Sequence, residues 1–310
     1  MTPPTPGPPA PAPSAPRLIA TDLDGTLLRG DKSVSPRTVA ALAAAEEAGI
    51  EVFFVTGRPA RWMDVVSDHV HGHGLAICGN GAAVVDLHGG PGRHRFVKIR
   101  ELAVAAALDV VRVLRAAAPG TSFAVERTGG LHHEPAYPPL HLDPAESVAP
   151  AEKLLATDVD VADQPVLKLL AHHPELGPDA FLDLARIAVG GLATVTRSSP
   201  SALLEISGPG VSKASTLALC CAERGISPAD VVAFGDMPND MEMLTWAGTS
   251  YAMGNAHPDV LASATGRTHT NDEDGVARII EDLLAGPGIT ASRPAPRTTA
   301  PGRSPTPGTE

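Results

Sequence analysis

Acidic side chains with a spacing suited to phosphoryl transfer occur near the N-terminus and again in the last third of the chain. Asp22 and Asp24 follow the apolar stretch LIAT, while Asp236, Asn239 and Asp240 follow the apolar stretch VVAF. A carboxylate at the end of a buried strand costs desolvation energy unless a cation or a ligand compensates its charge. These residues therefore predict a site that holds a cation, a substrate, or both.

Further polar residues occupy equivalent positions elsewhere in the sequence. Thr56, Gly57 and Arg58 follow the stretch EVFFV, and Asn80 lies in a glycine-rich turn after LAIC. Lys213 stands at the start of a predicted helix, where backbone N–H groups favour an anion. In an open parallel sheet, ligands bind outside the carboxyl ends of the strands. We therefore expect four carboxylates, a lysine and a threonine to gather at one edge of a sheet.

This set of groups is suited to phosphoryl transfer through a covalent intermediate. A carboxylate can attack phosphorus and form an aspartyl phosphate. A hard cation such as Mg²⁺, held by oxygen ligands, lets the anionic nucleophile approach an anionic phosphate. A lysine and a hydroxyl group balance the remaining phosphate charge. A second acid can protonate the leaving oxygen and then activate water, a role open to Asp24 if it leans toward Asp22.

The elements that must position these groups alternate between strands and helices. Residues 17–22, 50–56 and 75–86 are short apolar stretches typical of strands in a buried sheet. Between the first two, residues 35–49 begin with a serine cap followed by proline and end at a glycine, the signature of a helix. The pattern predicts an α/β fold with a doubly wound, mostly parallel sheet, that is, a Rossmann-like core.

The middle of the chain changes character, and both ends lack core-forming composition. We predict a discontinuous core domain over residues 17–84 and 202–284, interrupted by an inserted α+β cap domain over residues 85–201, where strands outnumber helices. The tails, residues 1–16 and 285–310, are rich in proline and are expected to be disordered, because they cannot bury enough apolar surface to offset their ordering entropy.

Composition excludes several classes of function. The formal net charge of −11 argues against a general nucleic-acid binder, which relies on basic residues to displace counterions. No apolar run approaches the length of about 20 residues that a membrane span needs, and the N-terminal tail does not resemble a signal peptide. The cysteines, Cys78, Cys220 and Cys221, do not have a zinc spacing, so we expect reduced thiols and a cytoplasmic protein.

Four motifs in this order resemble those of haloacid dehalogenase-like hydrolases: DLDGTLL, VTGR, GVSK and GDMPND. The long insertion after the third strand, together with NGA and the later MGNA, resembles the Cof-like (type IIB) phosphatase branch. This resemblance implies a Mg²⁺-dependent phosphatase that hydrolyses a small soluble phosphate monoester, such as a sugar phosphate, through an aspartyl-phosphate intermediate.

The resemblance also assigns roles to individual residues. Asp22 would be the nucleophile, Asp24 the general acid and base, and Lys213 the cation that steadies Asp22 and the phosphoryl group. The residues expected to bind the phosphorylated substrate are Thr56, Gly57, Arg58, Asn80 and Asn239. The residues expected to hold Mg²⁺ are Asp22, Asp24 through its backbone carbonyl, Asp236, and Asp240 through a bound water.

Other readings stay open at this stage. A phosphomutase or a dedicated sugar-phosphate phosphatase would share the core residues, and a phosphometabolite-binding sensor would keep the fold without turnover. In the insertion, His132, His133, Glu134 and Tyr137 are weak candidates for substrate contact, as are the cations Arg127, Lys168 and Arg197 for a second anionic group. The histidine pairs lack zinc spacing. The sequence names neither the physiological substrate nor the oligomeric state.

Overall fold

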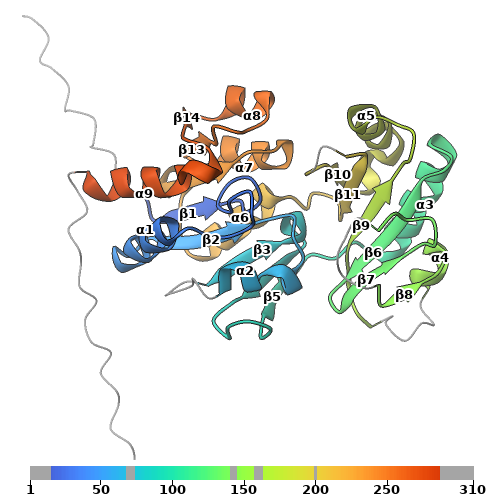
Figure 1. Ribbon diagram of the computed structural model, residues 1–310. Coiled ribbons are helices and arrows are strands. Elements are labelled where there is room, and N and C mark those ends of the chain that lie inside the picture. The colour runs from blue at the N-terminus through green and yellow to red at the C-terminus, as the bar shows by residue number, and fades with distance from the viewer. Residues whose placement is uncertain (1–14, 68–73, 140–144, 157–162, 199–200, 287–310) are drawn as a thin grey trace, which may run out of the picture.

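Two β-sheets of unequal size, each with its own helices, make up the structure (Figure 1). The structure, a computed structural model, describes five stretches of the chain: residues 15–67, 74–139, 145–156, 163–198 and 201–286. The predicted disordered tails lie almost entirely outside these residues.

The larger sheet has eight strands and carries both ends of the described chain. In spatial order its strands are β14 (Gly266–Arg267), β13 (Thr249–Ala252), β12 (Val231–Gly235), β1 (Leu18–Thr21), β2 (Glu51–Val55), β3 (Leu75–Cys78), β4 (Ala83–Asp86) and β5 (Arg95–Ile99). All neighbours from β14 to β3 run parallel, whereas β4 and β5 add an antiparallel edge. The prediction of an α/β fold with a mostly parallel sheet is therefore confirmed.

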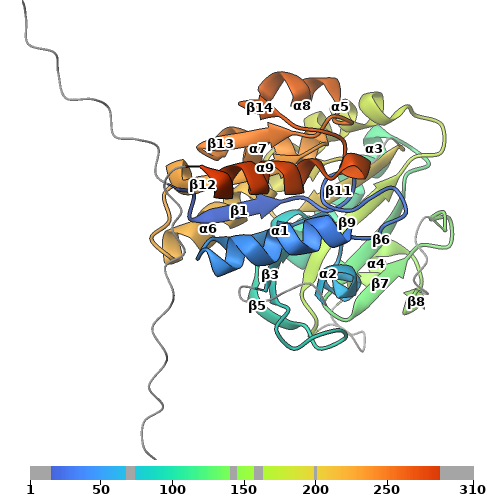
Figure 2. The ribbon, with the colours of Figure 1, turned by 60° about the vertical axis from the view of Figure 1, so that its left-hand side comes forward.

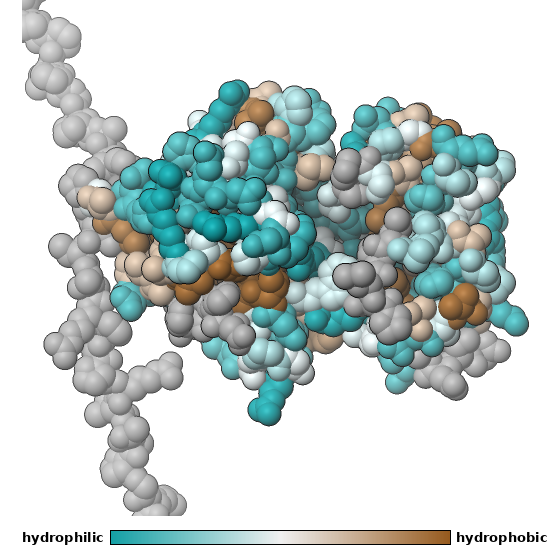
Figure 3. Space-filling view, in the orientation of Figure 1, coloured by the Kyte–Doolittle hydropathy of each residue, from teal (hydrophilic) through white to brown (hydrophobic). Residues whose placement is uncertain are grey.

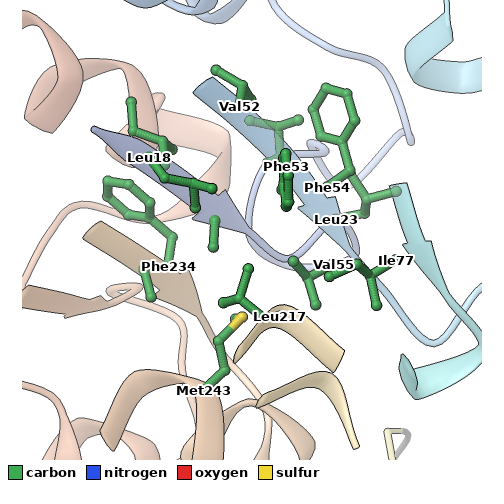
Figure 4. Packing of buried hydrophobic residues seen from close by; sticks show 14 of the residues in the cluster. Leu18, Leu23, Val52, Phe53, Phe54, Val55, Ile77, Leu217, Phe234 and Met243 are labelled. Carbon is green, nitrogen blue, oxygen red and sulfur yellow. The ribbon is translucent and has the colours of Figure 1, made fainter. Parts of the chain in front are cut away.

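Helices cover both faces of this sheet. They are α1 (Pro36–Glu47), α2 (Asp64–Ser67), α6 (Lys213–Glu223), α7 (Met241–Trp246), α8 (Pro258–Ser263) and α9 (Gly275–Ala285). Helices α1 and α9 pack together on one face (Figure 2), while α6 and α7 pack on the other through residues such as Leu217 and Met243 (Figure 4). None of the helices in the described ranges has the length and hydrophobicity that a membrane crossing requires.

The smaller sheet forms the cap. Its strands, in spatial order, are β10 (Thr194–Thr196), β11 (Leu203–Ser207), β9 (Val166–His172), β6 (Ser122–Arg127), β7 (Gly130–His133) and β8 (Ser147–Val148). The helices α3 (Val104–Ala117), α4 (Ala151–Leu154) and α5 (Pro178–Val189) pack on one of its faces. Along β9 the side chains alternate, because Leu169 and Ala171 join this helical core whereas Lys168 and Leu170 point the other way, toward the larger sheet.

Two strands lie in a different sheet from the one that the predicted limits of the insertion, residues 85 and 201, imply. Strand β5, expected inside the insertion, pairs with β4 at the edge of the larger sheet, and β11, expected in the core, lies between β9 and β10 of the cap. Both strands pair antiparallel with close neighbours, and such a strand has the same sequence pattern in either sheet. We therefore propose that the inserted segment runs from about residue 100 to residue 207.

The chain enters and leaves the cap at one place. A Cβ atom at Gly208 would lie 2.7 Å from the backbone oxygen of Glu101, so the outgoing and returning segments touch there. Arg100 strengthens this crossing, because its guanidinium donates hydrogen bonds of 2.7 Å to the hydroxyl groups of Ser215 and Thr216 in α6. The two connections therefore lie side by side next to the start of α6.

Each sheet has a separate hydrophobic core. The larger cluster includes Leu18, Phe53 and Phe234 under the central strands (Figure 4), and the smaller one includes Phe123 and Phe181 between the cap sheet and its helices. Aliphatic side chains supply most of the remaining volume, as the low aromatic content of the sequence predicts. Figure 3 shows the two lobes with a hollow between them, and the residues at this hollow are largely polar.

Candidate active site

The ends of three central strands bring the sequence-predicted residues to one edge of the larger sheet. In the parallel register, Thr21 of β1 pairs with Phe54 of β2 and Phe234 of β12, so the residues that follow these strands lie side by side. The backbone N–H of Asp22 donates to the carbonyl of Phe234 at 3.1 Å and continues this pairing beyond β1. Asp22, Thr56 and Asp236 are therefore neighbours in space although they are far apart in the sequence.

Lys213 lies at the centre of this edge. Its Nζ donates hydrogen bonds of 2.6 Å to Oδ1 of Asp22 and to Oδ1 of Asp240, and its side chain is 1% exposed. Lys213 is the first residue of α6, which a reciprocal capping box between Ser212 and Ser215 fixes in place. Burial alone would lower the pKa of Lys213, but the two carboxylates overcome this effect and hold it above its ordinary value.

A third buried carboxyl group, that of Asp236, lies beside the two that Lys213 contacts. One oxygen atom from each of Asp22, Asp236 and Asp240 lies within 4.8 Å of the others. Burial raises the pKa of Asp22 well above its usual range despite the lowering effect of Lys213, and burial together with the neighbouring Asp240 raises the pKa of Asp236 to about 7. This excess of negative charge and the all-oxygen donor set fit a hard divalent cation, so the buried triad could hold a metal ion.

The turn after β1 packs directly against this acidic triad. Thr26 donates a hydrogen bond of 3.1 Å from its hydroxyl to Oδ1 of Asp236. Gly25 has a φ of +79°, and a Cβ atom at this position would lie 2.2 Å from Oδ2 of Asp236. A glycine is therefore required in the DLDGT stretch, both for its backbone conformation and for the close approach of the turn to the acid.

Asp240 is held by its surroundings rather than turned toward solvent. While Oδ1 accepts from Lys213, Oδ2 accepts hydrogen bonds of 3.0 Å from the backbone N–H groups of Asp236 and Met237. These bonds fix the loop after β12 and with it the orientation of the Asp236 side chain. Asp240 thus connects Lys213 to the loop that carries Asp236.

Asp24 lies on the open side of the site and is paired with two cations. Arg58 donates to both of its oxygens at 2.5 and 2.7 Å, and Lys32 donates to Oδ1 at 2.9 Å. Burial would raise the pKa of Asp24, but the hydrogen bonds and charges of Arg58 and Lys32 overcome this and lower it to about 2. The structure therefore places Asp24 beside Arg58, with its side chain 40% exposed toward the cavity.

The remaining predicted residues divide into two groups. Thr56, Gly57 and Arg58, together called the Thr56–Arg58 loop below, line the cavity along with Asn239. Asn80 is buried in a turn with a φ of +55°, and its amide is occupied on both sides: its oxygen accepts from Asn239 at 3.0 Å and its Nδ2 donates to Glu205 at 2.7 Å. Asn80 therefore lies behind the cavity wall rather than on its surface.

A cavity of about 350 Å³ lies between the acidic edge and the cap sheet. On the core side it is bounded by Asp22, Asp24, Asp236 and the Thr56–Arg58 loop. The cap sheet closes the opposite side with the side chains Glu126, Lys168, Leu170, Ser198, Ser201, Leu203 and Glu205. The site is thus a partly open cavity with the carboxylates at one end and a mixed polar and apolar wall at the other.

Several of these cavity residues were not identified from the sequence. Lys32, in a surface turn with a φ of +68°, has no neighbouring motif that marks it. Arg61 and Glu126 pair across the boundary between core and cap, with Arg61 Nη2 at 3.2 Å from Glu126 Oε2 in one of their two hydrogen bonds. Only the packing of the cap on the core brings these two residues together, so no local signal in the sequence could have found the pair.

Most of the weaker candidates in the insertion lie away from the cavity. Glu134 accepts hydrogen bonds from the backbone N–H groups of Phe123 and Ala151, which marks it as a structural residue of the cap. Arg127 is buried and donates to two backbone carbonyls, at 2.6 and 2.9 Å. Of the cap residues considered from the sequence, Lys168 is the one that lines the cavity within the described ranges.

Comparison with known proteins identifies the family. The family model for haloacid dehalogenase-like hydrolases matches residues 19–280. YitU of Bacillus subtilis (strain 168), a 5-amino-6-(5-phospho-D-ribitylamino)uracil phosphatase, is 30% identical over 274 residues, covering 86% of this chain and 97% of YitU. The pyridoxal phosphate phosphatase YbhA of Escherichia coli (strain K12) is also 30% identical, over 271 residues, with the same coverage of 86% and 97%.

A solved structure supports the same fold. The subclass IIB sugar phosphatase BT4131 aligns with a TM-score of 0.69 at 19% sequence identity, covering 86% of this chain and 98% of that structure. The likeness extends over both the mostly parallel sheet and the cap. The chain therefore belongs to the haloacid dehalogenase-like hydrolases, and it has the fold of the type IIB structure.

Proposed function

We propose that this protein is a Mg²⁺-dependent phosphatase that hydrolyses a small phosphate monoester through an aspartyl phosphate on Asp22. The observation that carries the proposal is the pairing of the buried Asp22 carboxylate with Lys213 at the core end of the cavity between core and cap. YitU and YbhA, which act on small phosphorylated metabolites according to their names, support the size class of the substrate.

In this mechanism the Asp22 carboxylate attacks phosphorus, and the bond between phosphorus and the leaving oxygen breaks. Lys213 holds one Asp22 oxygen and leaves the other free for attack. The hydroxyl group of Thr56 and the guanidinium of Arg58, which follow β2, would bind the phosphoryl oxygens. Thr56 is already at the strand end before the reaction, whereas Arg58 would exchange part of its pairing with Asp24 for the phosphoryl group.

Asp22 and Asp236 would hold Mg²⁺ through their carboxylates, with the backbone carbonyl of Asp24 as a further oxygen ligand. Asp240, whose two oxygens are engaged by Lys213 and backbone N–H groups, would act through a bound water instead. The ion would supply positive charge that lets the anionic carboxylate approach an anionic phosphate.

Asp24 would serve as the general acid and then the general base. In its present pairing with Arg58 and Lys32, the low pKa of about 2 keeps Asp24 ionised. We propose that an incoming phosphoryl group competes for Arg58 and Lys32, so that the pKa of Asp24 rises and its carboxyl group can donate a proton to the leaving oxygen. The same carboxylate then accepts a proton from the water that hydrolyses the aspartyl phosphate.

The cap side of the cavity limits the kind of leaving group. On this side Lys168 is paired with Glu205, and Glu126 is paired with Arg61 of the core. Among the described residues of this wall, a second phosphate would meet no surplus positive charge, whereas hydroxyl or N–H groups would face carboxylates and apolar parts would face Leu170 and Leu203. We therefore propose a substrate with one phosphoryl group on a polar, uncharged alcohol, such as a sugar or polyol phosphate.

A phosphate-release screen tests the proposed function. The panel contains phosphorylated sugars, polyols, nucleotides and cofactors, each assayed with Mg²⁺ and with EDTA. We expect inorganic phosphate from at least one single-phosphoryl compound with Mg²⁺, its loss with EDTA, and weaker turnover of the diphosphate members. Return of the phosphoryl group to a second hydroxyl would identify a mutase, and tight binding without turnover would identify a sensor; either result contradicts the proposal.

Replacing Asp24 with Asn should affect substrates according to their leaving group. A sugar phosphate has a poor leaving group and should lose about 10²- to 10⁴-fold in kcat, whereas acetyl phosphate, whose leaving carboxylate needs no proton, should still phosphorylate Asp22. Because the variant also lacks the base for hydrolysis, labelled aspartyl phosphate should accumulate during the reaction. Acid quenching then allows it to be detected on the protein. If the rate of Asp22 phosphorylation fell equally for both substrates, Asp24 would not be the group that donates a proton to the leaving oxygen.

A further inference from the structure

A buried ion pair connects the cap to the core directly behind the Thr56–Arg58 loop. Lys168 of β9 and Glu205 of β11 lie 2.7 Å apart, and each is 4% exposed. Both belong to the cap sheet, yet their other contacts reach the core: Lys168 Nζ donates to the carbonyl of Gly57 at 2.8 Å, and Glu205 Oε2 accepts from Asn80 at 2.7 Å. The pair is therefore carried by one sheet and docked on the other.

The core side of this contact is closely fitted. A Cβ atom at Gly57 would lie 3.3 Å from Oδ1 of Asn80 and 3.4 Å from Oε2 of Glu205, so the loop approaches the pair more closely than most side chains would allow. Asn80 in turn accepts from Asn239, which lies in the loop that carries Asp236 and Asp240. One chain of hydrogen bonds thus runs from Lys168 to two of the loops that line the cavity.

The position of Gly57 explains what Lys168 can control. Gly57 lies between Thr56, whose hydroxyl accepts from the backbone N–H of Arg58 at 3.1 Å, and Arg58 itself. A hydrogen bond to the Gly57 carbonyl fixes the peptide between Gly57 and Arg58, and so sets the direction of both flanking side chains. A shift of about 1 Å in such groups can cost about 100-fold in rate.

The energetics favour a contact that forms and breaks with the cap. If the cap moved away, Lys168 and Glu205 would stay together on adjacent strands, while water would replace Gly57 and Asn80 as their partners. Docking removes water from the ion pair, which costs free energy. It also forms two hydrogen bonds to charged groups, which contribute favourable free energy. Because the two terms oppose each other, the net free energy of docking is smaller than either term alone, which suits a lid that opens during turnover.

We propose that Lys168 is a positioning residue that orients the Thr56–Arg58 loop for phosphoryl binding when the cap is closed, and that Glu205 holds Lys168 for this task. This inference rests on the proposed function, because it assigns the loop to the phosphoryl group. It differs from a role in substrate selection, since Lys168 acts here through the backbone of Gly57 rather than by touching the leaving group.

The test compares Lys168→Met with Lys153→Met, a control on the exposed face of α4 in the same cap. The substrate is acetyl phosphate, whose leaving group is too small to contact the cap wall, and the inhibitor is inorganic vanadate, which occupies a phosphoryl site. We expect Lys168→Met to lower kcat/KM and to raise the vanadate inhibition constant, each by about 10- to 100-fold. Partial unfolding would lower the active fraction but would not change an inhibition constant.

Two further variants separate positioning from loss of charge balance. Glu205→Gln keeps an acceptor for both Lys168 and Asn80 and should change the vanadate constant by less than about fivefold. The neutral double variant Lys168→Met with Glu205→Gln leaves no unpaired buried charge, so it should fold like the wild type and still bind vanadate weakly. Vanadate binding at wild-type strength in the double variant would overturn the inference.

The outcomes also distinguish this inference from the proposed function. If the wild-type protein turns over phosphate esters but Lys168→Met does so equally well with acetyl phosphate, only the positioning role fails. If Lys168→Met is impaired with larger substrates alone, Lys168 contacts the leaving group and the inference is again wrong. If the wild type releases phosphate from no ester in the panel, the proposed function itself fails.

Discussion

Replacing Asp22 with Asn should lower kcat by on the order of 10⁴-fold or more while the free energy of unfolding stays unchanged or rises. An amide oxygen is a far weaker nucleophile than a carboxylate and forms no stable acyl phosphate. The variant removes a carboxyl group whose pKa is raised by burial, that is, one whose ionised form is disfavoured in the folded state. Phosphate release and urea denaturation measure the two effects independently.

The matched control for this variant is Asp282→Asn on the exposed face of α9, which makes the same chemical change far from the cavity. The control should leave both kcat and the unfolding free energy within experimental error. Turnover by Asp22→Asn above one hundredth of the wild-type rate would show that another group attacks phosphorus. A large loss of stability would show that Asp22 is needed mainly for folding.

Replacing Lys213 with Met should have the largest combined effect on activity and stability. The ammonium group is the shared partner of Asp22 and Asp240 at 2.6 Å, and its removal leaves three buried carboxyl groups to repel one another. Breaking a buried ion pair in this way costs about 3 to 5 kcal/mol of unfolding free energy. Phosphate turnover should be lost as well, because the nucleophile loses its orientation and the phosphoryl group loses a cation.

The stability loss in Lys213→Met should depend on pH. Without the lysine, the pKa values of Asp22 and Asp236, which burial already raises, rise further above those of the unfolded chain, so the folded state binds more protons between about pH 4 and 8. The stability of the variant must then fall as pH increases through that range, and the gap to the wild type should be wider at pH 8 than at pH 5. Urea denaturation at both values checks this expectation.

The control for this variant is Lys98→Met, which removes a surface ion pair with Glu223 between β5 and α6. Exposed pairs contribute at most about 1 kcal/mol, so this change should be small and nearly independent of pH. If Lys213→Met destabilised the protein no more than Lys98→Met, the three acids would not depend on their shared lysine. The assigned electrostatic balance would then be wrong.

Local sequence patterns were sufficient to predict the mostly parallel core. Strands β1, β2 and β12 are short apolar runs that end at polar residues, and the helix from Pro36 begins with the serine cap and proline that its sequence indicates. The predicted limits of the insertion, residues 85 and 201, differ from the sheet membership of β5 and β11, because an antiparallel strand is specified by its partner rather than by its own residues. Pairing depends on which strands meet in space, and the composition of a segment does not encode this.

The candidate site was predictable to a similar degree. Asp22 and Asp236 follow strands of the core and Lys213 begins helix α6, and the order of these core elements fixes where the three residues meet. The pairs that cross to the cap, such as Lys168 with Gly57, depend on how two separately folded sheets dock. Asn80 was expected to bind substrate, yet its αL turn places its amide between Asn239 and Glu205, a position that the flanking glycines alone do not reveal.

The meeting of Glu101 and Gly208 at one crossing has an evolutionary consequence. Because the chain leaves the core and returns to it at adjacent points, the intervening segment is an inserted domain whose two ends lie close together. A segment of another length or architecture can be spliced at this junction without moving the catalytic strands. New selectivity can therefore arise by exchange of a module, and a chimera that joins this core to a foreign lid at residues 100 and 208 is a practical route to altered substrate choice.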